Sequence, residues 1–179
     1  RYGFDTIVQA VAVAKDRVPG IQFRFMGTGD YLGDVMRLAA SLNVRDRVHH
    51  LGFVPFEQMI EEILLADACV VAVKASPYSV LVHTNKMYEY MALERPIIAS
   101  RLGSVAAYAP DEAVLYFEPG NAMDLAEKLV WAVSHPDDMA RRVARASAVY
   151  ERLRWERAKQ SYLGGYRDVP AEKSSKEPG

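Results

Sequence analysis

The chain has 179 residues, of which half are hydrophobic and a quarter are charged, a composition typical of one globular domain with a core of its own. The formal net charge of −1 argues against a general nucleic-acid-binding protein. No apolar run approaches the roughly 20 residues of a membrane span. The single cysteine, Cys69, excludes an internal disulfide and favours a reducing compartment, so we expect a cytoplasmic protein.

Helical and strand patterns alternate along the chain. The expected elements are helix 5–17, strand 21–27, helix 30–42, strand 47–53, helix 56–66, strand 68–73, a helix that begins at Thr84 or Asn85, strand 96–100 and strand 113–120. Residues 122–167 are expected to be helical with a break near His135-Pro136, and the polar tail 168–179 to be disordered. The alternation predicts an α/β fold over 1–167, with a doubly wound, mainly parallel, Rossmann-like sheet and helices at the C-terminal end.

The helical pattern begins almost at the first residue, Arg1. Because a helix in an α/β unit usually follows a strand, we expect this chain to be a fragment of a longer protein whose upstream part is not included.

Ligands of such sheets bind at the carboxyl ends of the strands, which selects the loops 27–30, 52–56, 74–85 and 100–105. In the first loop, Gly27 and Gly29 allow a backbone to approach a ligand closely; the alternative is a tight turn with Asp30 as a helix cap. Gly33 follows Gly29 by four positions instead of three, so the dinucleotide-binding fingerprint is absent.

In the second loop, Gly52, Phe53 and Val54 lie between a strand and a helix. A planar base could lie against this loop and bond to its backbone. The alternative is a simple turn in which Phe53 covers the edge of the core.

The stretch from His83 to Ser100 opens a helix with Thr84 and Asn85, both strong N-cap residues. The start of a helix carries unpaired amides and a partial positive charge, and Lys86 adds a cation where the helix dipole favours an acid. An external anion such as a diphosphate would explain that cation. Glu89 lies one turn further on the same face, where a carboxylate can accept hydrogen bonds from ribose hydroxyls; the alternative is a Lys86–Glu89 surface pair.

Five segments together resemble one protein family. "FRFMGTGD", "DRVHHLGFV", "LLADACVVAV" and "NKMYEYMALERPIIASRLGSV" are similar to the C-terminal half of a retaining glycosyltransferase of the large family 4, and "RWERAKQSYLGGY" resembles the closing helix of that family. The resemblance implies one half of a GT-B fold. It implies a nucleotide diphosphate sugar as donor substrate, with no cofactor and no metal ion.

The resemblance also implies roles for single residues. Glu89 matches the second glutamate of the Glu-x7-Glu motif, which holds the ribose. His83 precedes Thr84, Asn85 and Lys86, which match the helix start at the diphosphate. Gly52, Phe53 and Val54 match the loop that contacts the nucleobase, and Gly27 and Gly29 match the glycine turn that faces the interdomain cleft.

The sequence departs from the family pattern at three places. Leu81 replaces the first glutamate of the motif, so His83 or Ser79 would have to take over its contact with the sugar. Tyr2-Gly3 stands in place of a Lys-Gly pair. Glu94 replaces the glycine after the helix, where a left-handed residue other than glycine costs about 1 kcal/mol.

Two further features have simple interpretations. His49 and His50 are adjacent in a strand and point to opposite faces, so they do not bind one metal ion together. Residues 139–167 carry eight Arg or Lys against two acids. This pattern favours a solvated face over a peripheral contact with an anionic membrane at the inner face of the cell.

We therefore expect a donor-binding domain of a glycosyltransferase that acts in polysaccharide or glycoconjugate biosynthesis and transfers a sugar to an acceptor hydroxyl with retention. Lys86 would stabilise the leaving diphosphate and Glu89 would anchor the ribose. The acceptor domain lies outside the fragment, so we expect nucleotide binding without turnover. The alternatives are a sugar-nucleotide epimerase of the same fold and a non-catalytic nucleotide-sugar-binding or scaffold domain.

Overall fold

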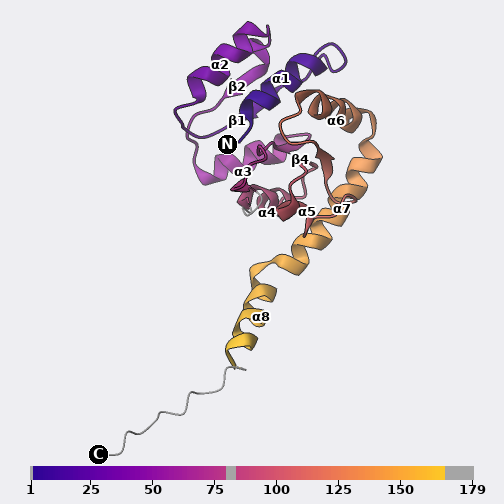
Figure 1. The fold of residues 1–179 in the computed structure, drawn as a ribbon. Helices are drawn as coiled ribbons and strands as arrows, with labels where there is room; N and C mark the ends of the chain where they lie inside the picture. Colours follow the sequence, from indigo (N-terminus) through magenta and orange to yellow (C-terminus); the bar gives the residue numbers. More distant parts are fainter. Residues whose placement is uncertain (1, 80–83, 168–179) are drawn as a thin grey trace, which may run out of the picture.

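The computed structural model describes residues 2–79 and 84–167, which alternate between helices and short strands (Figure 1). In chain order the elements are α1 (Phe4–Ala14), β1 (Phe23–Phe25), α2 (Leu32–Ser41), the 3-10 helix η1 (Arg45–Arg47), β2 (Val48–His50), α3 (Phe56–Leu65), β3 (Cys69–Val71), α4 (Asn85–Ala92), β4 (Ile97–Ser100), α5 (Gly103–Ala106), β5 (Leu115–Phe117), α6 (Ala122–Ser134), α7 (Pro136–Leu153) and α8 (Trp155–Arg167). The expectations for Leu81, for His83 and for disorder in the tail 168–179 lie outside the described residues.

The described strands pair only in parallel. β1 pairs with β2, while β3, β4 and β5 form a second set with β4 in the middle. Parallel strands joined by helices confirm the predicted α/β, Rossmann-like class. The described strands form two hydrogen-bonded sheets where the sequence predicted one.

The start of α1 contacts both sheets. The ring centroid of Phe4 lies 5.0 Å from that of Phe25 in β1. Gly3, with a φ of 60°, lies against the backbone that follows β3: a Cβ atom added there would be 1.9 Å from the carbonyl oxygen of Ala72. This residue therefore has to be glycine, and it places Tyr2 at the carboxyl ends of the strands.

Several element boundaries differ from the sequence prediction. α2 begins at Leu32, and its N-cap residue is Tyr31 without a side-chain cap, so the alternative of Asp30 as the cap is wrong. A short helix, α5, occupies the region expected to be a turn. The break at Pro136 is confirmed, and a second break occurs at Arg154, whose backbone is extended.

The core has two parts. One packs α1 and α6 against the strands around the fully buried Val8, Val11 and Leu125. The other lies under α4 and α7 around Met87 and Met91.

Cys69 in β3 is also buried, and burial raises the pKa of its thiol to about 12, with nearby Arg95 acting in the opposite direction. The thiol is therefore neutral at physiological pH, as expected for a structural cysteine.

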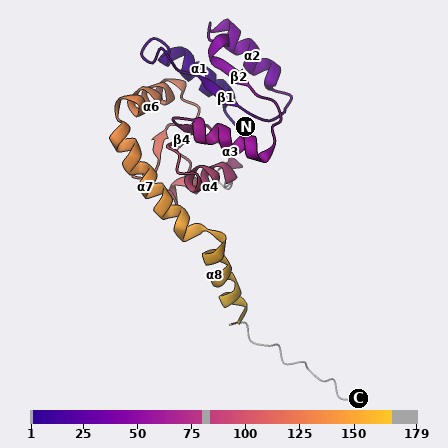
Figure 2. The same cartoon turned by 180° about the vertical axis from the view of Figure 1, so that it is seen from behind.

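The three C-terminal helices lie progressively further from the strands. α6 lies beside α1, α7 runs along the molecule past α4, and α8 extends away from it (Figures 1 and 2). In the described parts of the chain, no helix combines the length and apolar character needed to cross a bilayer.

Candidate functional site

The first turn of α4 opens at the carboxyl edge of β3 and β4. Thr84, one of the two residues that the sequence offered for the start of this helix, is its N-cap residue, with an extended backbone (φ −96°, ψ 128°). Its carbonyl oxygen accepts a hydrogen bond of 3.2 Å from the amide of Met87, whereas its side chain makes no capping bond. Within the described residues, no side chain caps the amides of Asn85 and Lys86, so these two can bond to an external acceptor.

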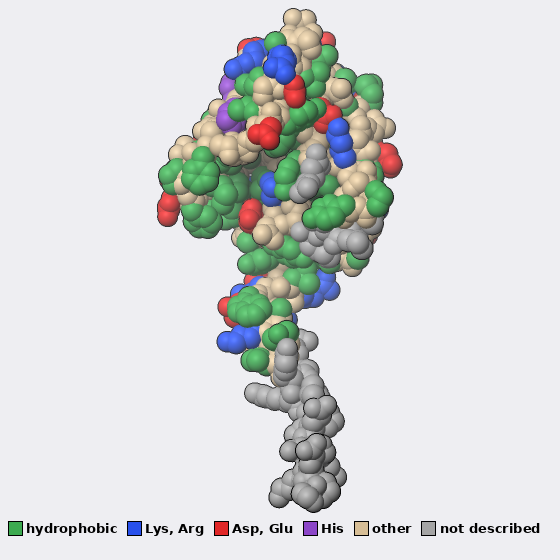
Figure 3. All heavy atoms as spheres, turned by 60° about the vertical axis from the view of Figure 1, so that its left-hand side comes forward, with side chains coloured by type: hydrophobic (Ala, Val, Ile, Leu, Met, Phe, Trp, Pro, Cys, Tyr) green, Lys and Arg blue, Asp and Glu red, His purple; other side chains and the backbone are tan. Residues whose placement is uncertain are grey.

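A cavity of about 850 Å³ lies at this helix start. Its walls come from α4, from the carboxyl ends of β3 and β4, from α3 and from the segment before α1. Lining residues include Tyr2, Met59, Lys74, Thr84, Asn85, Lys86, Glu89 and Ser100. The structure thus brings together four residues that the sequence assigned to one ligand, Thr84, Asn85, Lys86 and Glu89. Figure 3 shows a hollow on this molecule, bordered by hydrophobic side chains and by charges of both signs.

Two lysines line the cavity, and they differ in their partners. Lys74 forms an ion pair with Asp5 at the start of α1. Burial acts to raise the pKa of Asp5, but the hydrogen bond from Lys74, backbone hydrogen bonds and the charge of Lys74 together outweigh it, and the pKa is lowered. Lys86 Nζ instead lies 4.5 Å from the ring centroid of Tyr2. Among the described residues, no carboxylate pairs with Lys86, so the alternative of a Lys86–Glu89 surface pair is wrong.

The glycine loop at 27–29 lies in an adjoining cavity of about 510 Å³. Gly27, with a φ of 112°, donates a backbone hydrogen bond of 2.8 Å to the carbonyl of Gly52, and its own carbonyl lies 2.7 Å from Nε2 of His50. Gly29 also lines this cavity. Tyr2 and Lys74 line both cavities, so the two are neighbours.

Gly52, Phe53 and Val54 do not line either cavity. Gly52 needs its left-handed backbone, with a φ of 74°. Phe53 is 85% exposed, so the alternative in which it covers the edge of the core is wrong. A role of this loop in binding a base remains a prediction.

Ser79 and His83 are the two residues proposed to replace the sugar contact of the motif glutamate, whose position Leu81 occupies. Ser79 lines the larger cavity but is buried in a turn, where its hydroxyl accepts a hydrogen bond of 2.8 Å from the amide of Ser76. His83 lies outside the described residues.

The adjacent histidines are used in hydrogen bonds within the protein. His49 Nε2 bonds to the side chain of Gln22, and His50 Nε2 to the carbonyl of Gly27. Within the described ranges, no three His, Cys, Asp or Glu side chains gather in a way that could hold a metal ion. The expected independence from metal remains a prediction.

The sequence analysis gave no ligand-binding role to Tyr2, Lys74 or Ser100, which are among the residues that line the larger cavity. No local motif marks them, because they reach the cavity through the order of the strands. The nearest signal was that all three lie at the start or end of a predicted element at the carboxyl edge.

Comparisons with known proteins identify the family and the fold of the chain. A family model described as "Glycosyl transferases group 1" matches residues 1–135. A comparison with curated protein sequences gave no match.

Solved structures share the fold. A glycosyltransferase from Rickettsia africae has a TM-score of 0.80 and 17% identity, covering 96% of this chain and 45% of that one. Anabaena Alr3699/HepE in complex with UDP has a TM-score of 0.78 and 17% identity, covering 92% of this chain and 45% of that one. Sucrose-phosphate synthase from Thermosynechococcus elongatus has a TM-score of 0.77 and 24% identity, covering 93% and 42%. The chain thus spans less than half the length of these proteins and corresponds to the C-terminal half of larger GT-B structures.

Proposed function

The chain belongs to the group 1 glycosyltransferases, and we propose that it binds a nucleotide diphosphate sugar in the cavity at the start of α4. The longer protein would transfer the sugar to an acceptor hydroxyl with retention, in the synthesis of a polysaccharide or glycoconjugate. The observation that carries this proposal is the uncapped start of α4, which opens into a cavity beside a lysine that has no carboxylate partner among the described residues. HepE, a structural neighbour, has been crystallised with UDP and with UDP-glucose.

The diphosphate would lie at the first turn of α4. Helix starts bind phosphate groups because several amides and about half a positive charge converge there. Lys86 adds a full charge at the same place. When the glycosidic bond breaks, negative charge grows on the diphosphate, and a preorganised cation and amides stabilise it without the help of a metal ion or cofactor.

The ribose would lie further along α4. Glu89 is about 4.5 Å beyond Lys86 along the helix axis, lines the same cavity and is partly buried. A carboxylate in this position can accept hydrogen bonds from two vicinal hydroxyls. Gripping the ribose fixes the diphosphate, so Glu89 would contribute through the position of the leaving group.

The acceptor and the residues that bind it would come from the rest of the longer protein. We expect the 179-residue chain to bind nucleotide and to turn over nothing. The longer protein would act in the cytoplasm. A peripheral contact of α7 and α8 with the inner face of a membrane is the weaker part of this proposal, because Arg141 and Arg142 are already paired with Asp138 on their own helix.

Calorimetric titration of the chain with UDP, GDP and ADP tests the site. We expect one of these to bind, and Lys86→Ala and Glu89→Ala each to weaken it about tenfold, a loss of ~1.4 kcal/mol. Lys128→Ala on α6 and Glu61→Ala on α3, which lie outside the cavity, are the matched controls. Unchanged affinity in both cavity variants would refute the assignment.

A non-catalytic nucleotide-sugar-binding domain is the second candidate, favoured by Leu81 in place of the first motif glutamate. A sugar-nucleotide epimerase is the third. Radiolabelled nucleotide sugars incubated with the longer protein separate them: transfer to an acceptor, recovery of unchanged donor, or recovery of an isomeric sugar nucleotide.

A further inference from the structure

The hydroxyl group of Ser100 is buried at the end of β4. The residue is 2% exposed, and Oγ has no hydrogen-bond partner within the part of the chain that the structure describes. The carbonyl of Ser100, in contrast, accepts a hydrogen bond of 2.9 Å from the amide of Leu102. This unpaired hydroxyl belongs to a residue that lines the larger cavity.

A buried hydroxyl without a partner destabilises a folded protein, so such groups are rare and usually have a reason. The other serines that line this cavity do have hydrogen-bond partners. Ser76 and Ser79 exchange hydrogen bonds of 2.8 and 3.0 Å within their turn. The hydroxyl of Ser100 therefore still needs a partner from outside the described residues, and a ligand in the cavity could supply it.

The position of Ser100 along β4 indicates which part of a ligand it would meet. α4 and β4 are joined by a turn at 93–96, and in such a crossover the helix runs antiparallel to the strand. The strand β4 spans three residue-to-residue distances of about 3.3 Å between Ile97 and Ser100. The helix α4 spans seven rises of about 1.5 Å between Ala92 and Asn85. Both ends thus lie about 10 Å from the turn, and Ser100 is level with the first turn of α4.

We propose that the Ser100 hydroxyl donates a hydrogen bond to an oxygen of the diphosphate bound at the start of α4. This inference rests on the proposed function. Ser100 would complete a set of donors made of the α4 amides and Lys86, whereas Glu89 lies deeper along the helix and faces the ribose. Bonds to charged acceptors are stronger than neutral ones, so a single hydroxyl has a measurable effect.

The test is Ser100→Ala, titrated with UDP, GDP and ADP, with uridine, guanosine and adenosine, and followed by thermal unfolding. We expect about a tenfold loss of affinity for the nucleoside diphosphate that binds and no change for the corresponding nucleoside. The melting temperature should stay the same or rise, because the substitution removes an unsatisfied polar group. Ser41→Ala is the matched control, since that hydroxyl already donates to the carbonyl of Leu38 and lies on α2.

Each outcome has a distinct meaning. Equal affinity of Ser100→Ala and the unaltered chain for the diphosphate, while Lys86→Ala weakens it, overturns the inference about Ser100 alone. If Ser100→Ala loses the same affinity for the nucleoside as for the nucleoside diphosphate, Ser100 contacts the nucleoside, and the inference about the diphosphate is also overturned. Absence of binding by the unaltered chain to all three diphosphates overturns the proposed function and this inference with it.

Discussion

Tyr2 stands where the family pattern has a lysine, and its ring contacts the cation that we assign to the ligand. The ring centroid lies 4.5 Å from Lys86 Nζ. A tyrosine cannot replace a positive charge, but the face of an aromatic ring attracts an ammonium group by about 0.5–2 kcal/mol, depending on its exposure. We infer that Tyr2 is a positioning residue that holds Lys86 towards the mouth of α4.

Removing the ring should weaken the binding of a nucleoside diphosphate through Lys86. For Tyr2→Leu we expect a loss of about threefold, and for Tyr2→Phe no loss, since the ring face remains. The affinity for the nucleoside without phosphates should not change in either variant. Calorimetry measures all of these constants. A leucine variant that binds the diphosphate like the unaltered chain would show that Lys86 needs no support from Tyr2.

Glu94 has a left-handed backbone, with a φ of 53°. The turn after α4 explains it: the amide of Glu94 bonds to the carbonyl of Met91 and that of Arg95 to Tyr90, the two bonds of a Schellman motif. The sequence predicted this conformation because Glu94 occupies the place of the family glycine. A residue with a Cβ atom is strained there by about 1 kcal/mol.

Glu94→Gly should therefore stabilise the chain by about 1 kcal/mol, or raise its melting temperature by about 2–4 °C. The substitution also removes a bond of 3.3 Å from Ser147 Oγ, which is exposed and contributes little. Glu94→Ala is the control, because it loses the same bond but keeps the Cβ atom. Thermal unfolding of both variants decides the matter; a glycine variant no more stable than the alanine variant would contradict strain at this position.

Among the helices, the boundaries that the sequence predicted well carry strong local signals. Thr84 and Asn85 are of residue types favoured at N-caps, and the helix α4 begins with Thr84 as its N-cap; Pro136 marks the start of α7. The break at Arg154 carries neither Gly nor Pro, so no local rule reveals it. α5 has four residues, too few to show a helical period.

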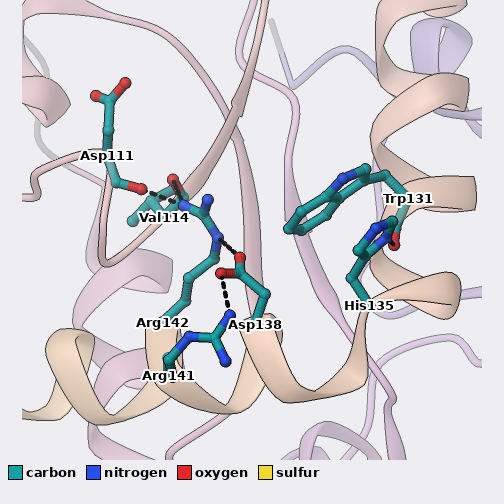
Figure 4. Close-up of polar contacts among 7 residues, drawn as sticks. All are labelled: Asp111, Val114, Trp131, His135, Asp138, Arg141 and Arg142. Atoms are coloured by element: carbon teal, nitrogen blue, oxygen red, sulfur yellow. Dashed lines mark hydrogen bonds and ion pairs between the residues drawn. The ribbon is translucent and has the colours of Figure 1, made fainter.

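Arg142, in the first half of α7, bonds to several other parts of the molecule. Arg142 pairs with Asp138 at 2.7 Å, donates to the carbonyls of Asp111 and Val114, and places its guanidinium 5.5 Å from the ring of Trp131 on α6 (Figure 4). Its side chain is only 20% exposed. One planar group thus connects α7, α6 and the loop before β5.

Arg142→Ala should lower the free energy of unfolding by about 2 kcal/mol, since two carbonyls and a carboxylate lose a charged donor. Arg141→Ala is the matched control: it pairs with the same Asp138, but its side chain is 70% exposed, so we expect a loss below about 0.5 kcal/mol. Urea unfolding measures both values. Nucleotide affinity should be unaffected in either variant, because neither residue lines the cavity.

The whole molecule shows which residues of the candidate site could be predicted from the sequence. Thr84, Asn85, Lys86 and Glu89 follow one another on a single helix, so helical geometry alone places them together. Tyr2 and Ser100 are brought to the same cavity by the parallel arrangement of the strands, and neighbouring positions along the chain do not indicate it. Such contacts between distant segments depend on the complete fold.

The C-terminal helix α8 is set apart from this body. It extends away from the other elements (Figure 1), and its described side chains are mostly exposed, with Trp155 at 65% and Tyr162 at 61%. Its main neighbour is α7. Neither core cluster contains a residue of α8, so the helix buries little apolar surface against the domain.

A chain that ends at Arg154 should therefore fold like the complete one. We expect a change in melting temperature below about 2 °C, since hydrophobic stabilisation scales with the apolar area buried, and unchanged nucleotide affinity. The truncation removes the exposed Trp155 and keeps Trp131, which stacks on His135 with ring centroids 4.4 Å apart. The fluorescence emission should accordingly shift to shorter wavelength. A chain that ends at residue 167 is the control for the tail, and a truncated chain that melts more than about 5 °C lower would show that α8 stabilises the domain in solution.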